Sequence, residues 1–107
     1  MRFYQGGKFE SSNRVSLRNY TDLFNGRSVM VYTTDEDIDM IYLESYDGKP
    51  NVPKCAIKKI DDKGRVGIPA SLRRGAVGFL VSLDNPKAII LKLIFTDSWD
   101  DESEEPG

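Results

Sequence analysis

The chain has 107 residues, of which 39% are hydrophobic and 30% are charged, and its formal net charge at pH 7 is −2. This length suits one small domain, or two very small halves that share a core. The chain has one cysteine and no histidine, which excludes an intrachain disulfide, a nucleophile–histidine pair and a histidine metal site. No segment has the apolar run of a signal peptide or the roughly 20 apolar residues of a membrane span. We therefore expect a cytoplasmic protein without membrane contact.

The first half, residues 1–48, reads as a β-turn-β unit, a short helical stretch and a β-hairpin. The β-turn-β unit covers residues 8–17, and Asn13 can take the positive φ that its turn requires. A polar stretch that could form a helical turn follows at residues 18–25. Strands are then expected at 28–33 and 38–43, which are rich in Val, Ile, Leu and aromatic residues.

The turn between those two strands has part of a calcium-loop pattern. Asp35, Asp37 and Asp39 have the starting spacing of such a loop, but Met40 occupies its glycine position and Tyr46 the position of its bidentate glutamate. We expect a polar hairpin turn and no metal site here. No catalytic constellation or phosphate-loop motif appears elsewhere, so we expect neither enzymatic activity nor a cofactor.

The second half, residues 49–95, repeats the order of the first half. It opens with a loop that contains Pro and Gly. Cys55 follows this loop, and we interpret it as a small residue of the next strand. Residues 59–68 then align with residues 8–17 without a gap. Both segments read cation, apolar, acid, three polar or turn residues, Arg, Val, small, aliphatic. This internal repeat predicts two copies of one β-turn-β unit.

Turn residues support the repeat. Gly64 occupies the position of Asn13 and can take the positive φ of a tight turn. Pro69 ends the strand and can open a short helical turn over residues 69–74. Strands are expected at 78–83 and 88–95, on the same composition argument as in the first half.

Charge is distributed unevenly along the chain. The formal charge is −3 in residues 1–48, +7 in residues 49–95 and −6 in residues 96–107. The last segment is acidic and poor in core-forming residues, which is typical of a disordered tail. Six cations lie within residues 57–74: Lys58, Lys59, Lys63, Arg65, Arg73 and Arg74. A fixed basic surface of this kind favours a polyanion such as DNA.

Two simpler interpretations of these cations stay open. They can form a solvated basic face that keeps the protein soluble. Arg65 can also be held in a structural ion pair by Asp61, which lies four residues earlier across the turn, and Arg14 with Glu10 would be the corresponding pair in the first half.

The string from Lys59 to Arg74, KIDDKGRVGIPASLRR, resembles the AbrB/SpoVT/MraZ group of swapped-hairpin DNA-binding proteins. The shared pattern is an acid, three residues and an arginine, then an aliphatic residue and proline, then a basic turn. The resemblance continues weakly into residues 87–92, and the first half lacks the glycine and proline. It implies a mainly β fold with short helices, in which two pseudo-symmetric halves, residues 1–48 and 49–95, interleave into one small swapped-hairpin barrel, as in the MraZ arrangement.

The same resemblance implies a DNA-binding transcriptional regulator that uses a basic β-hairpin and turn face. Its candidate DNA contacts are Lys58, Lys59, Lys63, Arg65, Arg73 and Arg74, with Arg14 and Arg18 from the first half. Only four residues, 75–78, separate Arg74 from Phe79 in the next expected strand, so the helix and turn that the family has there must be shorter. Two alternatives stay open: an antitoxin-like or inhibitor protein that binds a basic protein partner through the acidic tail, and an assembly scaffold that does not bind DNA. Each is compatible with a homo-oligomer.

Overall fold

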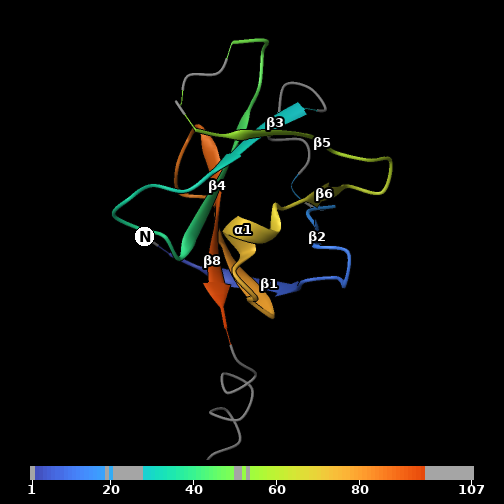
Figure 1. The fold of residues 1–107 in the computed structure, drawn as a ribbon, viewed down its shortest axis with the longest axis vertical. Coiled ribbons are helices and arrows are strands. Elements are labelled where there is room, and N and C mark those ends of the chain that lie inside the picture. The colour runs from blue at the N-terminus through green and yellow to red at the C-terminus, as the bar shows by residue number, and fades with distance from the viewer. Residues whose placement is uncertain (1, 19, 21–27, 50–51, 53, 96–107) are drawn as a thin grey trace, which may run out of the picture.

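A computed structural model describes residues 2–18, 20, 28–49, 52 and 54–95. In this part of the chain the protein is mainly β, with eight strands in antiparallel sheets and one short helix (Figure 1). The elements are β1 (Tyr4–Lys8), β2 (Arg14–Ser16), β3 (Ser28–Tyr32), β4 (Met40–Ser45), β5 (Ala56–Lys59), β6 (Arg65–Gly67), α1 (Ala70–Arg73), β7 (Gly78–Ser82) and β8 (Ala88–Ile94). No described helix is long and apolar enough to cross a membrane. The acidic tail and most of the helical stretch expected at 18–25 lie outside the described residues.

Six strands form one sheet in the order β1-β7-β8-β4-β3-β5, and β2 pairs with β6 in a second, two-stranded sheet. β1 and β5 are the two edges of the larger sheet, and they do not pair with each other among the described strands. The strands therefore do not close into the barrel that was expected. The mainly β prediction is confirmed at the level of antiparallel sheets.

Strand pairing crosses between the two halves of the sequence. The first strand of each half pairs with the third strand of the other, β1 with β7 and β5 with β3. The two registers match, because Lys8 lies opposite Gly78 and Lys59 lies opposite Ser28. β2 also pairs with β6 and β4 with β8, so only the hairpins β3–β4 and β7–β8 stay within one half.

The hydrophobic core draws on both halves. Val15 and Val66 face each other across the β2–β6 pair, and both are buried. Val29, Leu43 and Leu91 of the larger sheet join the same cluster. Burying a side chain of this size contributes about 1.5–3 kcal/mol relative to leaving it exposed. Residues of both halves therefore belong to one buried cluster.

The strands expected at 28–33, 78–83 and 88–95 agree with the structure to within one residue, whereas β4 does not. The β-turn-β units expected at 8–17 and 59–68 begin where β1 and β5 end, at Lys8 and Lys59. β4 begins at Met40, two residues later than expected. The N–H of Met40 donates to the carbonyl of Asp37 at 3.0 Å, so Ile38 lies inside a turn, where it is 50% exposed. Apolar composition alone assigned Ile38 to the strand, whereas the backbone hydrogen bond places it in the turn.

Helix α1 is one turn long and is ended by its backbone conformation. Arg74 has φ 55° and Gly75 has φ 80°, so two successive residues are left-handed and the helix stops. Leu72 packs against the core from this turn. The shortening that the sequence required before β7 is therefore achieved by a left-handed cap.

Candidate nucleic-acid interface

The turns at residues 10–13 and 61–64 share one geometry. The N–H of Asn13 donates to the carbonyl of Glu10 at 2.9 Å, and that of Gly64 donates to Asp61 at 3.0 Å. Asn13 has φ 64° and Gly64 has φ 77°, a region that asparagine and glycine enter more readily than other residues. The turn prediction is confirmed for both repeats.

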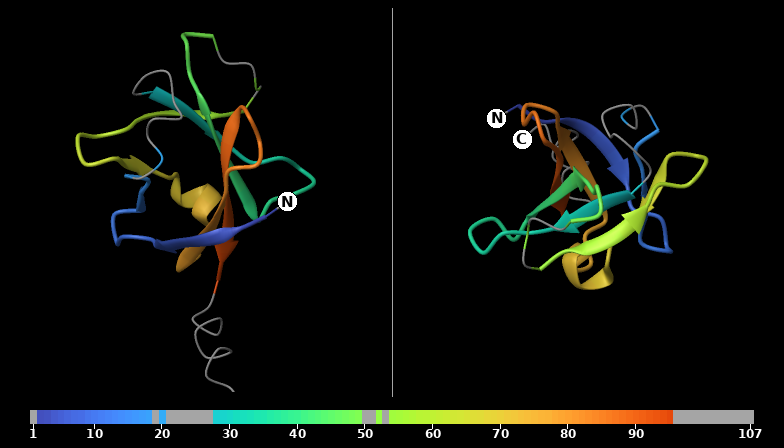
Figure 2. Two further views of the ribbon diagram at one scale, coloured as in Figure 1. Left: turned by 180° about the vertical axis from the view of Figure 1, so that it is seen from behind. Right: turned by 90° about the horizontal axis from the view of Figure 1, so that it is seen from above.

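The β2–β6 pair joins these turns into one surface. The N–H of Leu17 donates to the carbonyl of Gly64, and the N–H of Ile68 donates to the carbonyl of Asn13, each at 2.8 Å. Both turns project from the same end of the molecule, beside β2 and β6 (Figures 1 and 2). We call this surface, residues 10–18 and 61–67, the paired-turn face.

Two arginines and two carboxylates form an ionic cluster on the paired-turn face. Nε of Arg65 donates to Oδ2 of Asp61 at 2.8 Å. Arg14 lies 3.5 Å from Glu10 and 4.0 Å from Asp61, and Arg65 also lies 4.0 Å from Glu10. The cluster thus combines one arginine and one acid from each repeat, and the Asp61–Arg65 ion pair considered from the sequence is present.

The backbone of the second turn sets the charge state of Asp61. The N–H of Arg65 donates to Oδ1 of Asp61 at 2.8 Å, and this bond contributes most to lowering the pKa of that carboxyl. The Arg65 side chain and the N–H of Lys63 lower the pKa further. Asp61 is therefore ionised under ordinary conditions and orients the Arg65 guanidinium.

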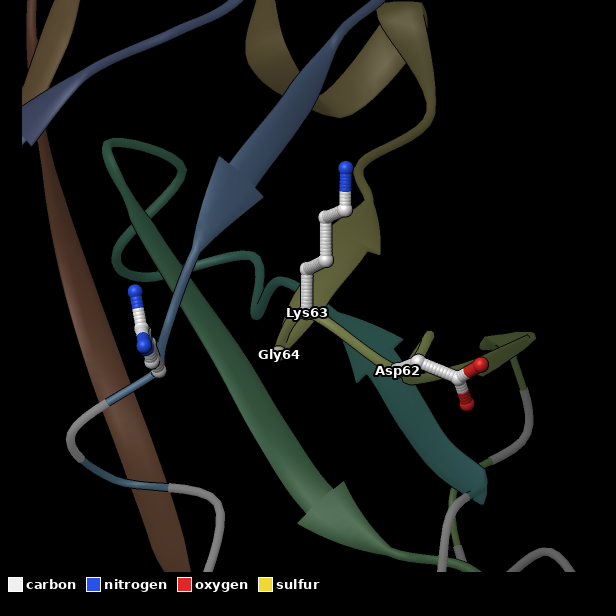
Figure 3. A pocket seen from close by; sticks show the side chains of 4 residues that line it. Asp62, Lys63 and Gly64 are labelled. Atoms are coloured by element: carbon white, nitrogen blue, oxygen red, sulfur yellow. The ribbon is translucent and has the colours of Figure 1, made fainter.

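Arg18 and Lys63 are exposed cations beside this cluster. Together with Asp62 and Gly64 they line a hollow of about 380 Å³ (Figure 3). The side chains of Asp62 and Lys63 leave the turn in different directions in Figure 3. A Cβ on Gly64 would lie 2.7 Å from Cα of Arg18, so glycine allows the Arg18 backbone to pack on the turn. Within the described residues, neither Arg18 nor Lys63 makes a side-chain ion pair.

Lys58 and Lys59 lie on β5, the strand that leads into the second turn. Exposure alternates along β5, so Lys59 is exposed and Lys58 is half-buried, and their side chains leave opposite faces of the strand. Lysines on a sheet edge also discourage pairing with another chain. These two lysines therefore do not share one surface with each other.

The guanidinium of Arg73, at the end of α1, binds the turn at residues 10–13. It donates to the carbonyl of Glu10 at 3.1 Å and to Oδ1 of Asn13 at 2.7 Å. Its Nε donates to the carbonyl of Ala76 at 2.7 Å, and its Cζ lies 4.6 Å from the centre of the Phe9 ring. These contacts tie the end of α1 to a turn about 60 residues away.

Arg74 lies elsewhere. Its guanidinium is 2.8 Å from Oδ1 of Asp39 in the β3–β4 turn and 5.2 Å from the centre of the Phe95 ring. The two neighbouring arginines therefore have different partners, and only Arg73 reaches the paired-turn face. Among the described residues, no three acids or cysteines gather into a metal site, including those of the β3–β4 turn.

Of the eight candidate DNA contacts, the structure brings together Arg14, Arg18, Lys63 and Arg65 on the paired-turn face. Arg73 contacts this face through Asn13. Lys8 was not among the candidates, although it is exposed and lines a hollow with Arg18. The internal repeat could have identified Lys8 as a candidate, because Lys8 aligns with the candidate Lys59. No protein-family model matches the sequence, and a search of curated proteins finds no match.

Proposed function

We propose that the protein is a DNA-binding transcriptional regulator whose contact surface is the paired-turn face. We propose also that its fold is a swapped-hairpin arrangement of the AbrB/SpoVT/MraZ type, with both halves in one chain. The crossed pairings β1–β7 and β5–β3, and the shared β2–β6 and β4–β8 pairs, support this arrangement.

One observation carries the functional proposal. Arg14 and Arg18 from the first repeat and Lys63 and Arg65 from the second lie on one projecting surface. DNA phosphates are neutralised by several cations held on one rigid surface. Here the rigidity comes from backbone hydrogen bonds between the repeats, not from any one loop.

Three of the four cations would have distinct roles. Arg18 and Lys63 are exposed and would contact phosphates. Arg65 is oriented by Asp61, and a guanidinium in a fixed orientation can donate two hydrogen bonds to one guanine. Glu10, Asp61 and Asp62 lie on the same face, so its positive excess is small. We therefore expect modest affinity for random DNA and a moderate salt dependence.

The test is a salt titration of binding to labelled duplexes of mixed genomic sequence, followed by fluorescence anisotropy. With about two phosphates neutralised, by Arg18 and Lys63, log K against log salt should have a slope of about −1.8. Arg18→Ala with Lys63→Ala should reduce that slope by about 1.8, since each lost phosphate contact accounts for about 0.9.

The control variant is Lys49→Ala with Lys87→Ala, which removes the same charge from exposed positions after β4 and between β7 and β8. It should leave the slope nearly unchanged. An equal reduction of the salt slope in both double variants would mean that net charge, and not the paired-turn face, controls binding. Absence of binding at low salt would rule out the regulator and leave the antitoxin-like or inhibitor protein and the assembly scaffold. Sedimentation would then examine the scaffold.

A further inference from the structure

A second hollow lies next to the paired-turn face, between β1 and the residues that follow β2. Its volume is about 310 Å³, the lower end of the range for small-molecule sites. A site of this size suits a ligand no larger than a single nucleotide. The lining residues are Gln5, Gly6, Gly7, Lys8, Ser16, Arg18, Tyr20 and Phe79.

Two adjacent glycines of β1, Gly6 and Gly7, line the hollow beside Phe79 of β7. A Cβ on Gly6 would collide with the Phe79 ring, so no side chain can occupy this position without moving the core. A Cβ on Gly7 would lie 3.7 Å from Cζ of Phe79, an ordinary contact. The pairing register shifts between Gln5 and Gly7, which further opens the strand here.

The lining chemistry matches a phosphate joined to a flat ring. Lys8 and Arg18 supply two exposed cations, and among the described residues that line the hollow none is acidic. Tyr20 is half-buried and packs against the core, which fixes an aromatic surface beside the two cations. Ser16 and Gln5 add hydrogen-bonding groups.

The corresponding hollow at the second repeat has a different balance of charges. It has a volume of about 340 Å³ and is lined in part by Ala56, Pro69 and Ser71. These residues stand 51 positions after Gln5, Arg18 and Tyr20, the offset of the internal repeat. The second hollow has one cation, Lys54, an aromatic ring, Tyr32, and an acid, Asp35. Two cations without an acid are thus found only in the first of these two hollows.

We propose that the first-half hollow binds a 5′-nucleoside monophosphate unit, with the phosphate between Lys8 and Arg18 and the base against Tyr20. The unit can be a free nucleotide or the phosphorylated end of a DNA strand, because both present the same phosphate and base. Base stacking on an aromatic side chain tolerates any base, so the site selects the nucleotide and not its identity. The inference shares Arg18 with the proposed function but does not rest on duplex binding.

The experiment is a ¹⁵N NMR titration of the full chain with AMP, adenosine, inorganic phosphate and a 5′-phosphorylated tetrathymidylate. AMP or the tetranucleotide should shift the signals of residues 5–8 and 16–20. Both should bind about tenfold more tightly than phosphate or adenosine alone, since the phosphate and the base each contribute. Shifts with AMP identify a free nucleotide as a ligand, and shifts with the tetranucleotide only identify a strand end.

Lys8→Gln should weaken this binding about fivefold, while Lys59→Gln, at the matching position of the second half, should leave it unchanged. Gly7→Val fills the hollow without removing charge, and should abolish nucleotide binding while sparing duplex binding. Absence of shifts, phosphate binding as tightly as AMP, or an equal effect of Lys8→Gln and Lys59→Gln would overturn the proposal. Because duplex DNA is titrated separately, loss of duplex binding alone counts only against the proposed function.

Discussion

Asn13 and Gly64 occupy matching places in turns 51 residues apart, and each accepts a backbone hydrogen bond from the other half. The carbonyl of Asn13 accepts from Ile68 and that of Gly64 accepts from Leu17, both at 2.8 Å. Both residues are left-handed. The conformation of each turn therefore affects the docking of the opposite half as well as the turn itself.

Gly64→Ala should destabilise the protein by about 2–4 kcal/mol. Alanine at φ 77° is strained, and its Cβ would meet Cα of Arg18 at 2.7 Å. Gly75→Ala is the matched control, because φ is 80° there but nothing lies within 4 Å of the added Cβ. It should cost about 1–2 kcal/mol, from backbone strain alone. Urea unfolding measures both, and equal losses would mean that the contact with Arg18 is unimportant.

Arg73→Ala should lower the free energy of unfolding by about 2–3 kcal/mol, because it removes hydrogen bonds to Glu10, Asn13 and Ala76. Arg74→Ala removes an exposed ion pair with Asp39 and a contact with the Phe95 ring, and should cost about 1 kcal/mol. Chemical denaturation of the two single variants measures the difference. If the two losses are alike, the contacts of Arg73 with the first turn do not stabilise the fold.

Asp61 should make stability depend on pH at the acid end. Its pKa is lowered in the folded protein, so it stabilises the fold at pH values above its unfolded value of 3.8. That contribution is lost as the pH falls from 3.8 through the lower, folded value. Asp61→Asn should remove this part of the dependence, as followed by melting temperature across the acid range. Asp35→Asn, in the exposed β3–β4 turn, controls for loss of one charge.

Tyr32 should ionise at a higher pH than an unfolded tyrosine. Burial raises its pKa, and the hydrogen bond from its hydroxyl to Glu44, at 2.8 Å, raises it further. Since an unfolded tyrosine ionises near pH 10.0, the stability of the fold should fall as the pH rises above that value. Ultraviolet absorbance titration of wild-type protein and Tyr32→Phe isolates the late step.

Near neutral pH, Tyr32→Phe should cost about 1 kcal/mol through loss of that hydrogen bond. Tyr42→Phe is the control, because Tyr42 stacks on Tyr32 with ring centres 5.3 Å apart and phenylalanine keeps the stack. A similar cost for both variants would show that stacking and packing, not the bond to Glu44, carry the effect.

The local structure could be predicted from local residues. Runs of Val, Ile and Leu located β3, β7 and β8, and Asn13 and Gly64 located the turns. These features depend on neighbours in the sequence, which is why they could be read there. The strand that begins at Met40 was misplaced because a turn hydrogen bond leaves no trace in apolar composition.

The site could be predicted only in part. Four of the eight candidate cations meet on the paired-turn face because the repeat put equivalent residues at equivalent positions. The role of Arg73 was not visible, since Phe9 and Asn13 lie 60 or more residues away and meet it only through the crossed pairing. Lys58 and Lys59 looked like one surface in the sequence, but strand alternation separates them. The closed barrel implied by the resemblance is not formed by the described strands, because β1 and β5 stay as separate edges of the larger sheet.

The crossed pairing also limits when the chain can fold during its synthesis. Lys8 of β1 has its partner at Gly78, which leaves the ribosome 70 residues later. At roughly 5–20 residues per second, β1 waits about 4–14 s before its partner strand exists. Neither the β1–β7 strand pair nor the hydrophobic core can be completed from the first half alone. The apolar strands of the first half therefore lack their partners from the second half throughout that interval. The short β1, with two glycines and a lysine, offers little surface for premature pairing while it waits.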